Sequence, residues 1–314
     1  MKAKILIVDS IAEVGVTILK DAGFAVDIQT NLTPEELKEK IRDYDVLVVR
    51  SRAKVSKDII DSAQNLKLVA RAGVGVDNID VDYATQKGVA VMNAPAGASN
   101  AVAELVIGLI LAVMRNIAPA DRMLRRNEWK KSALLGKELA GKTVGIIGFG
   151  RIGQLVATRL KGFECKFIAF DPLANKEKMR DLGVEHAKEL DDLYKVADVI
   201  TLHVPLNEKT RNMIHKGSIE KMKDGVIIIN TSRGGVVNED DLYDAIAGGK
   251  VAGAGIDTWQ NEPPQDNKLL KLDRVVGTQH LGASTKEAQR QESIDIAKQI
   301  VQAFNVVNNI ALLR

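Results

Sequence analysis

The chain has 314 residues, a length that favours two domains over one. Hydrophobic residues make up 46% and charged residues 27%, which is typical of a globular protein with real cores. The 44 basic and 41 acidic side chains are mixed along the sequence and give a net charge of +3, so no basic block indicates nucleic acid. This small excess of cations suits an anionic small molecule.

The N-terminal segment is predicted to be a first strand rather than a signal sequence, because Asp9 interrupts its apolar run. The longest apolar stretch, residues 105–114, is too short to span the roughly 30 Å of a membrane's hydrocarbon core. It is predicted to be a helix buried on nearly all sides, and we expect no membrane partner. The single cysteine, Cys165, has no partner within the chain, which favours a reducing compartment and a cytoplasmic protein.

Ten short apolar runs predict ten strands, most of which end at a polar residue or a glycine. They lie at residues 5–9, 45–49, 66–70, 89–93, 143–148, 166–171, 197–205, 225–232, 251–257 and 274–278. The runs are continuous rather than alternating, which indicates strands buried on both faces, as in parallel sheets. Helical stretches alternate with them, for example residues 33–42, where Thr33 precedes a proline at the first helical turn. The pattern predicts an α/β protein.

Ten strands are more than one open sheet usually holds, so two sheets are expected. The break is predicted at residues 95–99, where a loop opens a long helix. We therefore expect two doubly wound parallel-sheet domains with a cleft between them. The first, residues 1–98, is expected to be a flavodoxin-like substrate domain, and a Rossmann-type domain is expected to start at residue 99.

A glycine-rich turn lies between a predicted strand and a predicted helix of the second domain. It comprises Gly148, Gly150, Arg151, Ile152 and Gly153. A tight turn, close approach of the backbone to a pyrophosphate and close packing of helix on strand would explain the three glycines. Asp171 ends the next strand, where a carboxylate accepts hydrogen bonds from a ribose hydroxyl and repels a 2′-phosphate. A purely structural turn is the alternative, but the complete pattern predicts binding of NAD rather than NADP.

Polar residues follow three later strands, at the sheet edge where open α/β sheets bind ligands. They are Arg233, Asp257 with Glu262 in the loop after it, and His280. Each alone is compatible with an ordinary surface charge. Together they supply the groups needed for hydride transfer at a 2-hydroxy acid. The imidazole exchanges the hydroxyl proton, a carboxylate orients the imidazole, and a guanidinium holds the substrate carboxylate.

Four stretches in order, "GFGRIG", "LYKVADVITLHVPLNEKT", "MKDGVIIINTSRGGVVNEDDLYDAI" and "HLGAST", resemble the D-2-hydroxyacid dehydrogenase family over nearly the whole chain. The resemblance implies an enzyme with Arg233, Glu262 and His280 as its catalytic residues. It implies contacts to the cofactor from His203, Pro205, Thr210, Thr231, Ser232, Asp257, Gly282 and Ala283.

The same resemblance implies the domain organisation and a partner. A C-terminal helix at about residues 286–306 would return to the first domain. The substrate domain would then comprise residues 1–98 and 286–314, and the NAD-binding domain residues 99–285. The loop that carries Trp129 is similar to an arm that packs on a second subunit, so a homodimer through the NAD-binding domain is expected. His186 and His215 match nothing functional and are expected at the surface.

Within the family, "VVRSRAKVS", "RAGVGVDNID", "NAPAGASNAVAEL" and "HLGASTKEAQ" are most similar to the branch that acts on 3-phosphoglycerate. Arg50, Ser51 and Arg52 end the second predicted strand, and two guanidiniums with a hydroxyl suit a phosphate monoester. A solvated basic loop is the alternative. Gly73, Val74 and Gly75 complete the candidate substrate residues. The expected reaction is NAD-dependent oxidation of D-3-phosphoglycerate to 3-phosphohydroxypyruvate, the first step of phosphorylated serine biosynthesis.

Two other functions stay open. One is the same chemistry on a plain acid, as in glyoxylate, hydroxypyruvate or D-lactate enzymes, and the other is an NAD-sensing interaction protein. Val74 stands where relatives often have threonine, and Gln279 stands where they often have proline. The sequence ends at Arg314, without the regulatory domains of longer relatives, so no inhibition by serine is expected. No cluster has metal-ligand spacing, so no metal is expected.

Overall fold

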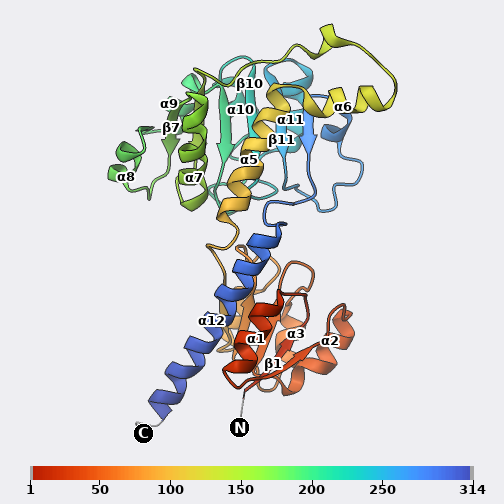
Figure 1. Cartoon of the computed structure of the whole chain (residues 1–314), viewed down its shortest axis with the longest axis vertical. Helices are drawn as coiled ribbons and strands as arrows, with labels where there is room; N and C mark the ends of the chain where they lie inside the picture. The colour runs from red at the N-terminus through yellow and green to blue at the C-terminus, as the bar shows by residue number, and fades with distance from the viewer. Residues whose placement is uncertain (1–2, 312–314) are drawn as a thin grey trace. The chain divides into compact units, whose positions relative to one another are not determined.

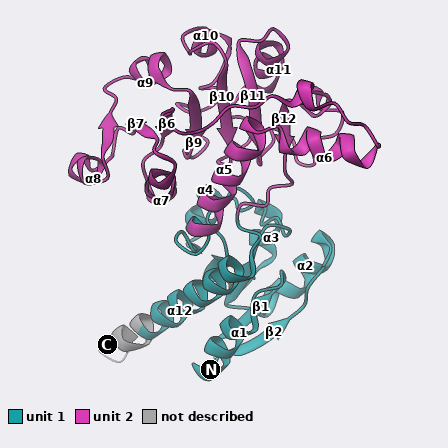
Figure 2. Ribbon diagram, turned by 45° about the horizontal axis from the view of Figure 1, so that its top comes forward, with its two compact units in different colours: residues 1–99, 283–314 teal, residues 100–282 magenta. Residues whose placement is uncertain are grey.

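The computed structural model describes residues 3–311, with side chains up to residue 305. It divides into two compact units (Figure 2): unit 1 is residues 1–99 with 283–314, and unit 2 is residues 100–282. Each unit has one parallel sheet between helices, which confirms the predicted α/β class with two doubly wound sheets. No single helix of the described part is long and apolar enough to cross a membrane. Helices α5 (Ser99–Met114) and α6 (Ile117–Arg125) pass that test only together, as a pair bent by 65°.

Unit 1 contains a five-stranded sheet in the order β2-β1-β3-β4-β5, which is the flavodoxin-like order. Its elements are β1 (Lys4–Ile7), α1 (Glu13–Asp21), β2 (Ala25–Ile28), α2 (Pro34–Lys40), η1 (Ile41–Asp43), β3 (Val46–Val49), α3 (Lys57–Ser62), β4 (Leu68–Arg71), α4 (Val81–Gln86), β5 (Ala90–Asn93) and α12 (Lys286–Ala311). The strand order reverses between β1 and β3, so the loops after these two strands diverge and leave space for a ligand.

Both faces of this sheet are buried, which explains the continuous apolar runs. Ile5 and Ile7 of β1 pack with helices α1 and α12, whereas Leu6 packs on the opposite face. Helix α12 lies along α1 (Figure 1), and a Cβ at Gly15 would lie 2.8 Å from the carbonyl oxygen of Ser293. The C-terminal helix is therefore part of the core of unit 1.

Unit 2 contains a seven-stranded sheet in the order β12-β11-β10-β9-β6-β7-β8. Its elements are α5 (Ser99–Met114), α6 (Ile117–Arg125), η2 (Lys131–Leu134), β6 (Thr143–Ile147), α7 (Arg151–Leu160), η3 (Lys161–Phe163), β7 (Lys166–Phe170), α8 (Lys176–Asp181), β8 (Val184–His186), α9 (Leu190–Val196), β9 (Val199–Leu202), α10 (Lys216–Glu220), β10 (Val226–Asn230), α11 (Glu239–Ala247), β11 (Val251–Ile256), η4 (Lys268–Lys271) and β12 (Val275–Gly277). Strands β6 to β11 follow the dinucleotide-binding order, and β12 is added beyond β11.

The ten apolar runs all form strands, but two further strands, β2 and β8, were not predicted. Both are edge strands, paired on one side only. Strand β2 is largely exposed, with Ile28 51% accessible, and β8 has three residues. An edge strand with one solvated face needs no continuous apolar run, so the criterion used for buried strands does not detect it.

Candidate active site

The glycine-rich turn lies where the strand order of unit 2 reverses, between β6 and β9. Gly148 has φ of +92°, and a side chain there would clash with the carbonyl oxygen of His203. A Cβ at Gly153 would clash with the carbonyl oxygen of Gly148, so helix α7 lies close against the strand. A Cβ at Gly150 would meet nothing within 4 Å. Two glycines are thus required by the protein's own packing, and the third borders open space.

This turn fits a dinucleotide. Gly150 immediately precedes α7, so the first backbone N–H groups of the helix and the positive end of its dipole face the space beside it. The carboxylate of Asp171 accepts hydrogen bonds from the N–H groups of Phe149 (2.8 Å) and Leu173 (2.8 Å). A carboxylate has about four acceptor sites, so capacity for ribose hydroxyls remains.

His203 borders the turn and is held there by its backbone. Its N–H donates to the carbonyl oxygen of Ile147 at 2.7 Å, and its Nε2 lies 3.1 Å from Thr201 Oγ1. Burial lowers the pKa of His203 to about 3, so the ring is neutral at physiological pH. In the following loop, Thr210 Oγ1 donates to the carbonyl oxygen of Pro205 at 2.6 Å.

The loop after β10 carries Thr231, Ser232 and Arg233 and is fixed by Asn230. The buried amide of Asn230 accepts from the N–H (3.1 Å) and hydroxyl (2.8 Å) of Ser232 and donates to the carbonyl oxygen of Arg233 (3.0 Å). Thr231 Oγ1 is buried and has no hydrogen-bond partner among the described residues. A buried hydroxyl without a partner in the folded chain is a group that a bound ligand or a water molecule can satisfy.

His280 and Glu262 are in direct contact. Nδ1 of His280 lies 2.9 Å from Glu262 Oε2 and 3.0 Å from Oε1. Glu262 Oε1 also accepts from the N–H of Trp259 at 3.1 Å, which orients the carboxylate. The imidazole is half exposed, and its Nε2 is the nitrogen that does not face Glu262. A carboxylate on one ring nitrogen and a second nitrogen for the substrate is the arrangement of an acid/base histidine.

Asp257 determines the conformation of the loop that carries His280. The backbone of His280 has φ of +54°, and its N–H donates to the carbonyl oxygen of Asp257 at 2.9 Å. The fully buried carboxylate of Asp257 accepts from Thr278 Oγ1 (2.5 Å), the N–H of Leu281 (2.7 Å) and the N–H of Gly282 (3.0 Å). Both oxygens of this aspartate, for which a cofactor contact was expected, thus bind the protein's own loop.

Trp259 connects three loops and was not identified from the sequence. Its Nε1 donates to the carbonyl oxygen of Thr278 at 2.9 Å, and a Cβ at Gly277 would lie 2.7 Å from its ring. A Cβ at Gly234 would clash with its carbonyl oxygen, so the loop of Arg233 lies directly against it. A tryptophan and two glycines in separate segments give no local signal of this contact.

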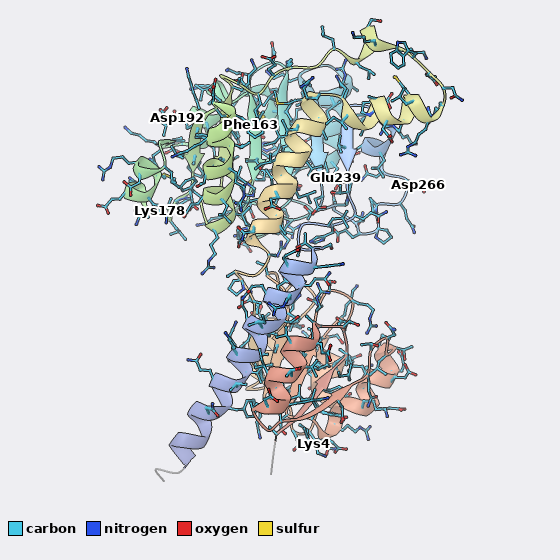
Figure 3. All side chains as sticks on the ribbon, viewed as in Figure 1. Lys4, Phe163, Lys178, Asp192, Glu239 and Asp266 are labelled. Carbon is cyan, nitrogen blue, oxygen red and sulfur yellow. The ribbon has the colours of Figure 1, made fainter. Side chains whose placement is uncertain are left out.

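Glu239, labelled in Figure 3, lies in the first turn of α11 and was also not identified from the sequence. Its carboxylate accepts from the N–H of Gln260 and from Asn267 Nδ2, both at 2.6 Å. Glu262 lies between these two residues, so the segment that carries it is fixed to α11. Gly282 packs against Val102, whose Cγ2 would lie 3.2 Å from a Cβ there. Gln279 is exposed, and nothing in the structure explains it.

In unit 1, the loops after β1 and β3 form a second candidate site. Asp9 accepts from the N–H groups of Arg50 (2.7 Å) and Ala53 (3.1 Å), and its Oδ1 lies 3.0 Å from Arg52 Nε. Arg52 also donates to the carbonyl oxygens of Val8 (2.7 Å) and Leu32 (3.1 Å). These three contacts leave two of the five N–H groups of Arg52 for a ligand, so its side chain mainly stabilises the loop.

Arg50 has a fixed backbone and a lightly bound side chain. Its carbonyl oxygen accepts from Arg71 Nε at 3.0 Å and Asn78 Nδ2 at 2.9 Å. Its guanidinium makes no hydrogen bond with the described residues, and Nη2 lies 3.7 Å from Glu292 Oε2. Ser51 beside it is exposed. Arg50 is therefore better placed than Arg52 to bind an anion.

The segment 73–75 contacts the side chain of Arg71, the last residue of β4. Arg71 was not identified as a site residue from the sequence. Arg71 Nη1 donates to the carbonyl oxygen of Gly75, and Asn93 Nδ2 donates to that of Val74. The carbonyl oxygen of Gly73 accepts from the N–H of Ala94 at 2.9 Å. Side-chain to backbone bonds therefore position this loop at the carboxyl ends of β4 and β5.

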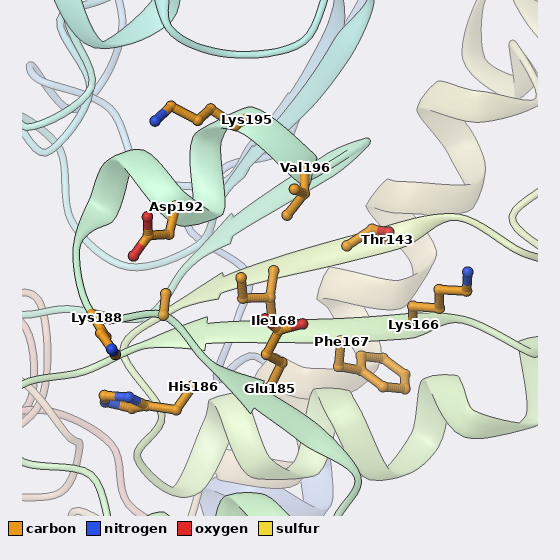
Figure 4. A pocket seen from close by; sticks show the side chains of 11 residues that line it. Thr143, Lys166, Phe167, Ile168, Glu185, His186, Lys188, Asp192, Lys195 and Val196 are labelled. Atoms are coloured by element: carbon orange, nitrogen blue, oxygen red, sulfur yellow. The ribbon is translucent and has the colours of Figure 1, made fainter.

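A cavity of about 590 Å³ lies elsewhere in unit 2, between β6, β7, β8 and α9 (Figure 4). Thr143 and Lys166, which line it, begin β6 and β7, so it borders the amino ends of these two strands, whereas the glycine-rich turn follows the carboxyl end of β6. His186 lines it as well. It is not part of the candidate active site. Within residues 3–311, no group of three histidine, cysteine or carboxylate side chains is arranged to hold a metal ion.

A family model described as "D-isomer specific 2-hydroxyacid dehydrogenase, NAD binding domain" matches residues 107–282. The chain is 50% identical over 311 residues to a D-3-phosphoglycerate dehydrogenase of Methanocaldococcus jannaschii, covering 97% of this chain and 59% of that protein. It is 52% identical over 279 residues to a hydroxypyruvate reductase of Thermotoga maritima, covering 88% of this chain and 90% of that protein. A glyoxylate reductase structure from Paecilomyes thermophila matches with a TM-score of 0.86 and 29% identity, covering 96% of this chain and 95% of that one. The chain thus spans little more than half of the archaeal phosphoglycerate dehydrogenase.

Proposed function

The chain belongs to the D-2-hydroxyacid dehydrogenase family, and we propose that it oxidises D-3-phosphoglycerate to 3-phosphohydroxypyruvate with NAD, as the first step of phosphorylated serine biosynthesis. The arginine cluster at the β1/β3 edge of unit 1 carries this choice of substrate. Plain hydroxy acids do not need such a cluster. The similarity to the M. jannaschii D-3-phosphoglycerate dehydrogenase supports it.

When bound, NAD supplies the hydride acceptor, and the residues of unit 2 do the rest. His280 takes the proton of the C2 hydroxyl on Nε2 as the hydride leaves C2, and it returns that proton in reduction. Glu262 keeps the other ring nitrogen protonated and stabilises the imidazolium that forms. Arg233 binds the substrate carboxylate and polarises the C2 oxygen.

The cofactor contacts are part of the same proposal. The N-terminus of α7 at Gly150 binds the pyrophosphate, and Asp171 accepts from the ribose. Neutral His203 and the buried Thr231 hydroxyl face the nicotinamide end. The remaining cofactor residues we propose are Arg151, Ile152, Pro205, Thr210, Ser232, Gly282 and Ala283, with Asp257 acting through the loop that its carboxylate holds.

The phosphate is assigned to unit 1. Arg50 is the principal ligand, Ser51 and the two remaining N–H groups of Arg52 are additional donors, and residues 73–75 complete the site. A phosphate monoester carries nearly two negative charges at neutral pH, and a guanidinium binds it through two parallel hydrogen bonds.

A substrate panel tests the proposal. kcat/KM is measured with NADH for phosphohydroxypyruvate, hydroxypyruvate, glyoxylate and pyruvate. We expect phosphohydroxypyruvate to be preferred by at least tenfold, and an equal or better rate with hydroxypyruvate would refute the choice of substrate. His280→Gln should lower kcat about 10²–10⁴-fold on every substrate, while the affinity for NADH stays within about twofold.

Arg50→Ala separates phosphate recognition from chemistry. Loss of a charge-assisted hydrogen bond of about 1.5–3 kcal/mol predicts a 10- to 150-fold fall in kcat/KM for phosphohydroxypyruvate and little change for hydroxypyruvate. Arg42→Ala is the matched control, because Arg42 is an exposed arginine before the amino end of β3. Equal losses on both substrates would contradict the phosphate role.

Hydroxypyruvate reduction is the second candidate function. The T. maritima hydroxypyruvate reductase matches the chain over 90% of its own length, whereas the archaeal phosphoglycerate dehydrogenase is covered for 59%. The same panel distinguishes the two. NADH binding without turnover of any 2-keto acid would instead indicate an interaction protein.

We also infer a cytoplasmic homodimer assembled through unit 2. Trp129 is 83% and Leu135 90% exposed in the segment between α6 and β6, and large apolar side chains at such exposure are typical of interaction surfaces. Trp129→Glu with Leu135→Glu should convert a dimer to a monomer in sedimentation experiments. An unchanged sedimentation coefficient would refute this interface.

A further inference from the structure

Glu292 is a buried carboxyl group that the proposed mechanism does not use. It lies in α12, is 1% exposed, and both of its carboxylate oxygens lack a hydrogen-bond partner within the described residues. Its stem is tightly enclosed, because a Cβ at Gly97 would lie 2.7 Å from its Cγ and 2.8 Å from its N. The side chain therefore has little freedom to reach other donors or solvent.

The charged groups that act on Glu292 come from three elements of unit 1. Arg50 follows β3 and places Nη2 at 3.7 Å, Arg71 ends β4, and Asp295 lies one turn further along α12. Burial raises the pKa of Glu292 to about 7, although the two arginines act to lower it and Asp295 acts in the same direction as burial. The carboxyl thus changes its charge within the physiological range.

We propose that Glu292 is a proton-dependent counter-ion of the anion site at Arg50. In the ligand-free protein, the ionised carboxylate neutralises Arg50. Binding of a phosphate-bearing acid to Arg50 is coupled to the uptake of one proton from solvent by Glu292. The inference rests on the proposed role of Arg50 as the phosphate ligand.

The geometry makes the two anions compete. At 3.7 Å the guanidinium is close enough for Coulomb attraction but makes no hydrogen bond with Glu292, so its donors are available to a ligand. Once a dianion binds Arg50, the carboxylate loses the attraction of Arg50, keeps only that of Arg71, and faces a new negative charge without a hydrogen bond from any described residue. A buried carboxylate in that position takes up a proton.

A structural role alone does not account for this residue. The hydrogen-bonding needs of Arg50's backbone are met by Asp9, Arg71 and Asn78, without Glu292. An apolar side chain of the same length would fill the space beside Gly97 without the desolvation that a carboxyl group incurs. The carboxyl adds a charge that depends on pH.

Coupling predicts a specific pH profile. If Glu292 is neutral in the complex, its ionisation in the free protein lowers the affinity for the ligand by the factor 1 + 10^(pH − 7), where 7 is the approximate pKa of Glu292. Relative to a variant that cannot ionise, the wild type should bind with equal affinity at pH 6 and about tenfold more weakly at pH 8. The titration of the phosphate itself cancels in this ratio.

The experiment is calorimetric titration of the full chain with 3-phosphoglycerate between pH 6 and pH 8.5, in two buffers of different ionisation enthalpy. Wild type, Glu292→Gln and Glu292→Met are compared, the second variant serving if the first fails to fold. Glu287→Gln is the matched control, because Glu287 is an exposed glutamate of the same helix. Wild type and the control should take up nearly one more proton than the Glu292 variants at pH 8, and the variants should bind about tenfold more tightly.

Equal affinities and equal proton uptake in wild type and the Glu292 variants would overturn the coupling. Failure of the substrate assignment gives a different result, because 3-phosphoglycerate would then fail to bind every protein, the variants included. In that case titration with inorganic phosphate tests the coupling independently of the substrate, since a phosphate bound to Arg50 also displaces Glu292. Absence of the proton difference there would likewise refute the inference.

Discussion

Asp257→Asn tests whether a single carboxylate holds the catalytic histidine in place. The substitution keeps the size of the side chain but leaves one acceptor oxygen where there were two. In the better amide orientation, that oxygen keeps the bonds from Thr278 and Leu281, and the amide NH₂ faces the N–H of Gly282.

The loss can be estimated from these contacts. An unpaired buried N–H costs about 1–3 kcal/mol, and two hydrogen bonds lose the strengthening given by a charged acceptor, about 0.5–1 kcal/mol each. The loop is therefore expected to lose about 3 kcal/mol of local stability. Each 1.4 kcal/mol is a factor of ten, so the amides of Leu281 and Gly282 should exchange with solvent about 100-fold faster.

Hydrogen exchange of the segment 275–284 measures this change, with kcat measured in parallel. We expect kcat to fall at least tenfold, because His280 depends on the loop for its left-handed backbone conformation. Asp273→Asn is the control: the same substitution at a 76% exposed side chain, whose partner among the described residues is Arg122, should change stability by less than about 0.5 kcal/mol.

Two results would refute the reasoning. Unchanged exchange in Asp257→Asn would mean that the carboxylate does not hold the loop. A positioning role also requires that Asp257→Asn causes no further loss of kcat in a His280→Gln background. Additive losses would show that Asp257 acts on the reaction separately from His280.

Two further predictions concern the glycine turn and its neighbour His203. The Gly150→Ala variant should keep the wild-type melting temperature, since φ is −73° and a Cβ there meets nothing within 4 Å, but it should bind NADH at least tenfold more weakly. The Gly153→Ala variant should have a lower melting temperature because its Cβ clashes with Gly148, and equal melting temperatures of the two variants would contradict this. Because burial lowers the pKa of His203 to about 3, the unfolded chain binds a proton below pH 6.5 that the folded protein does not. The free energy of unfolding should therefore fall by up to about 2 kcal/mol from pH 7 to pH 5. The His203→Asn variant should lose this pH dependence in denaturation experiments, and an unchanged slope would exclude His203 as its cause.

The sequence by itself determined the elements whose signals are local. A strand buried on both faces must be apolar throughout, so ten strands are visible as runs of a few residues. A turn that requires close backbone approach must be glycine, so the dinucleotide motif at residues 148–153 is visible as well. Polar residues directly after buried strands, such as Arg233, could be placed at one sheet edge because parallel strands all end there.

The tertiary structure decided what depends on partners distant in the chain. Edge strands β2 and β8 exist because a neighbouring strand offers hydrogen bonds, which leaves little mark on their own composition. Arg52 and Arg50 look alike in sequence, yet one is bound to Asp9 and two carbonyl oxygens while the other faces Glu292. A hydrogen bond or a buried charge needs two groups within a few ångströms, and only the folded chain determines which groups meet.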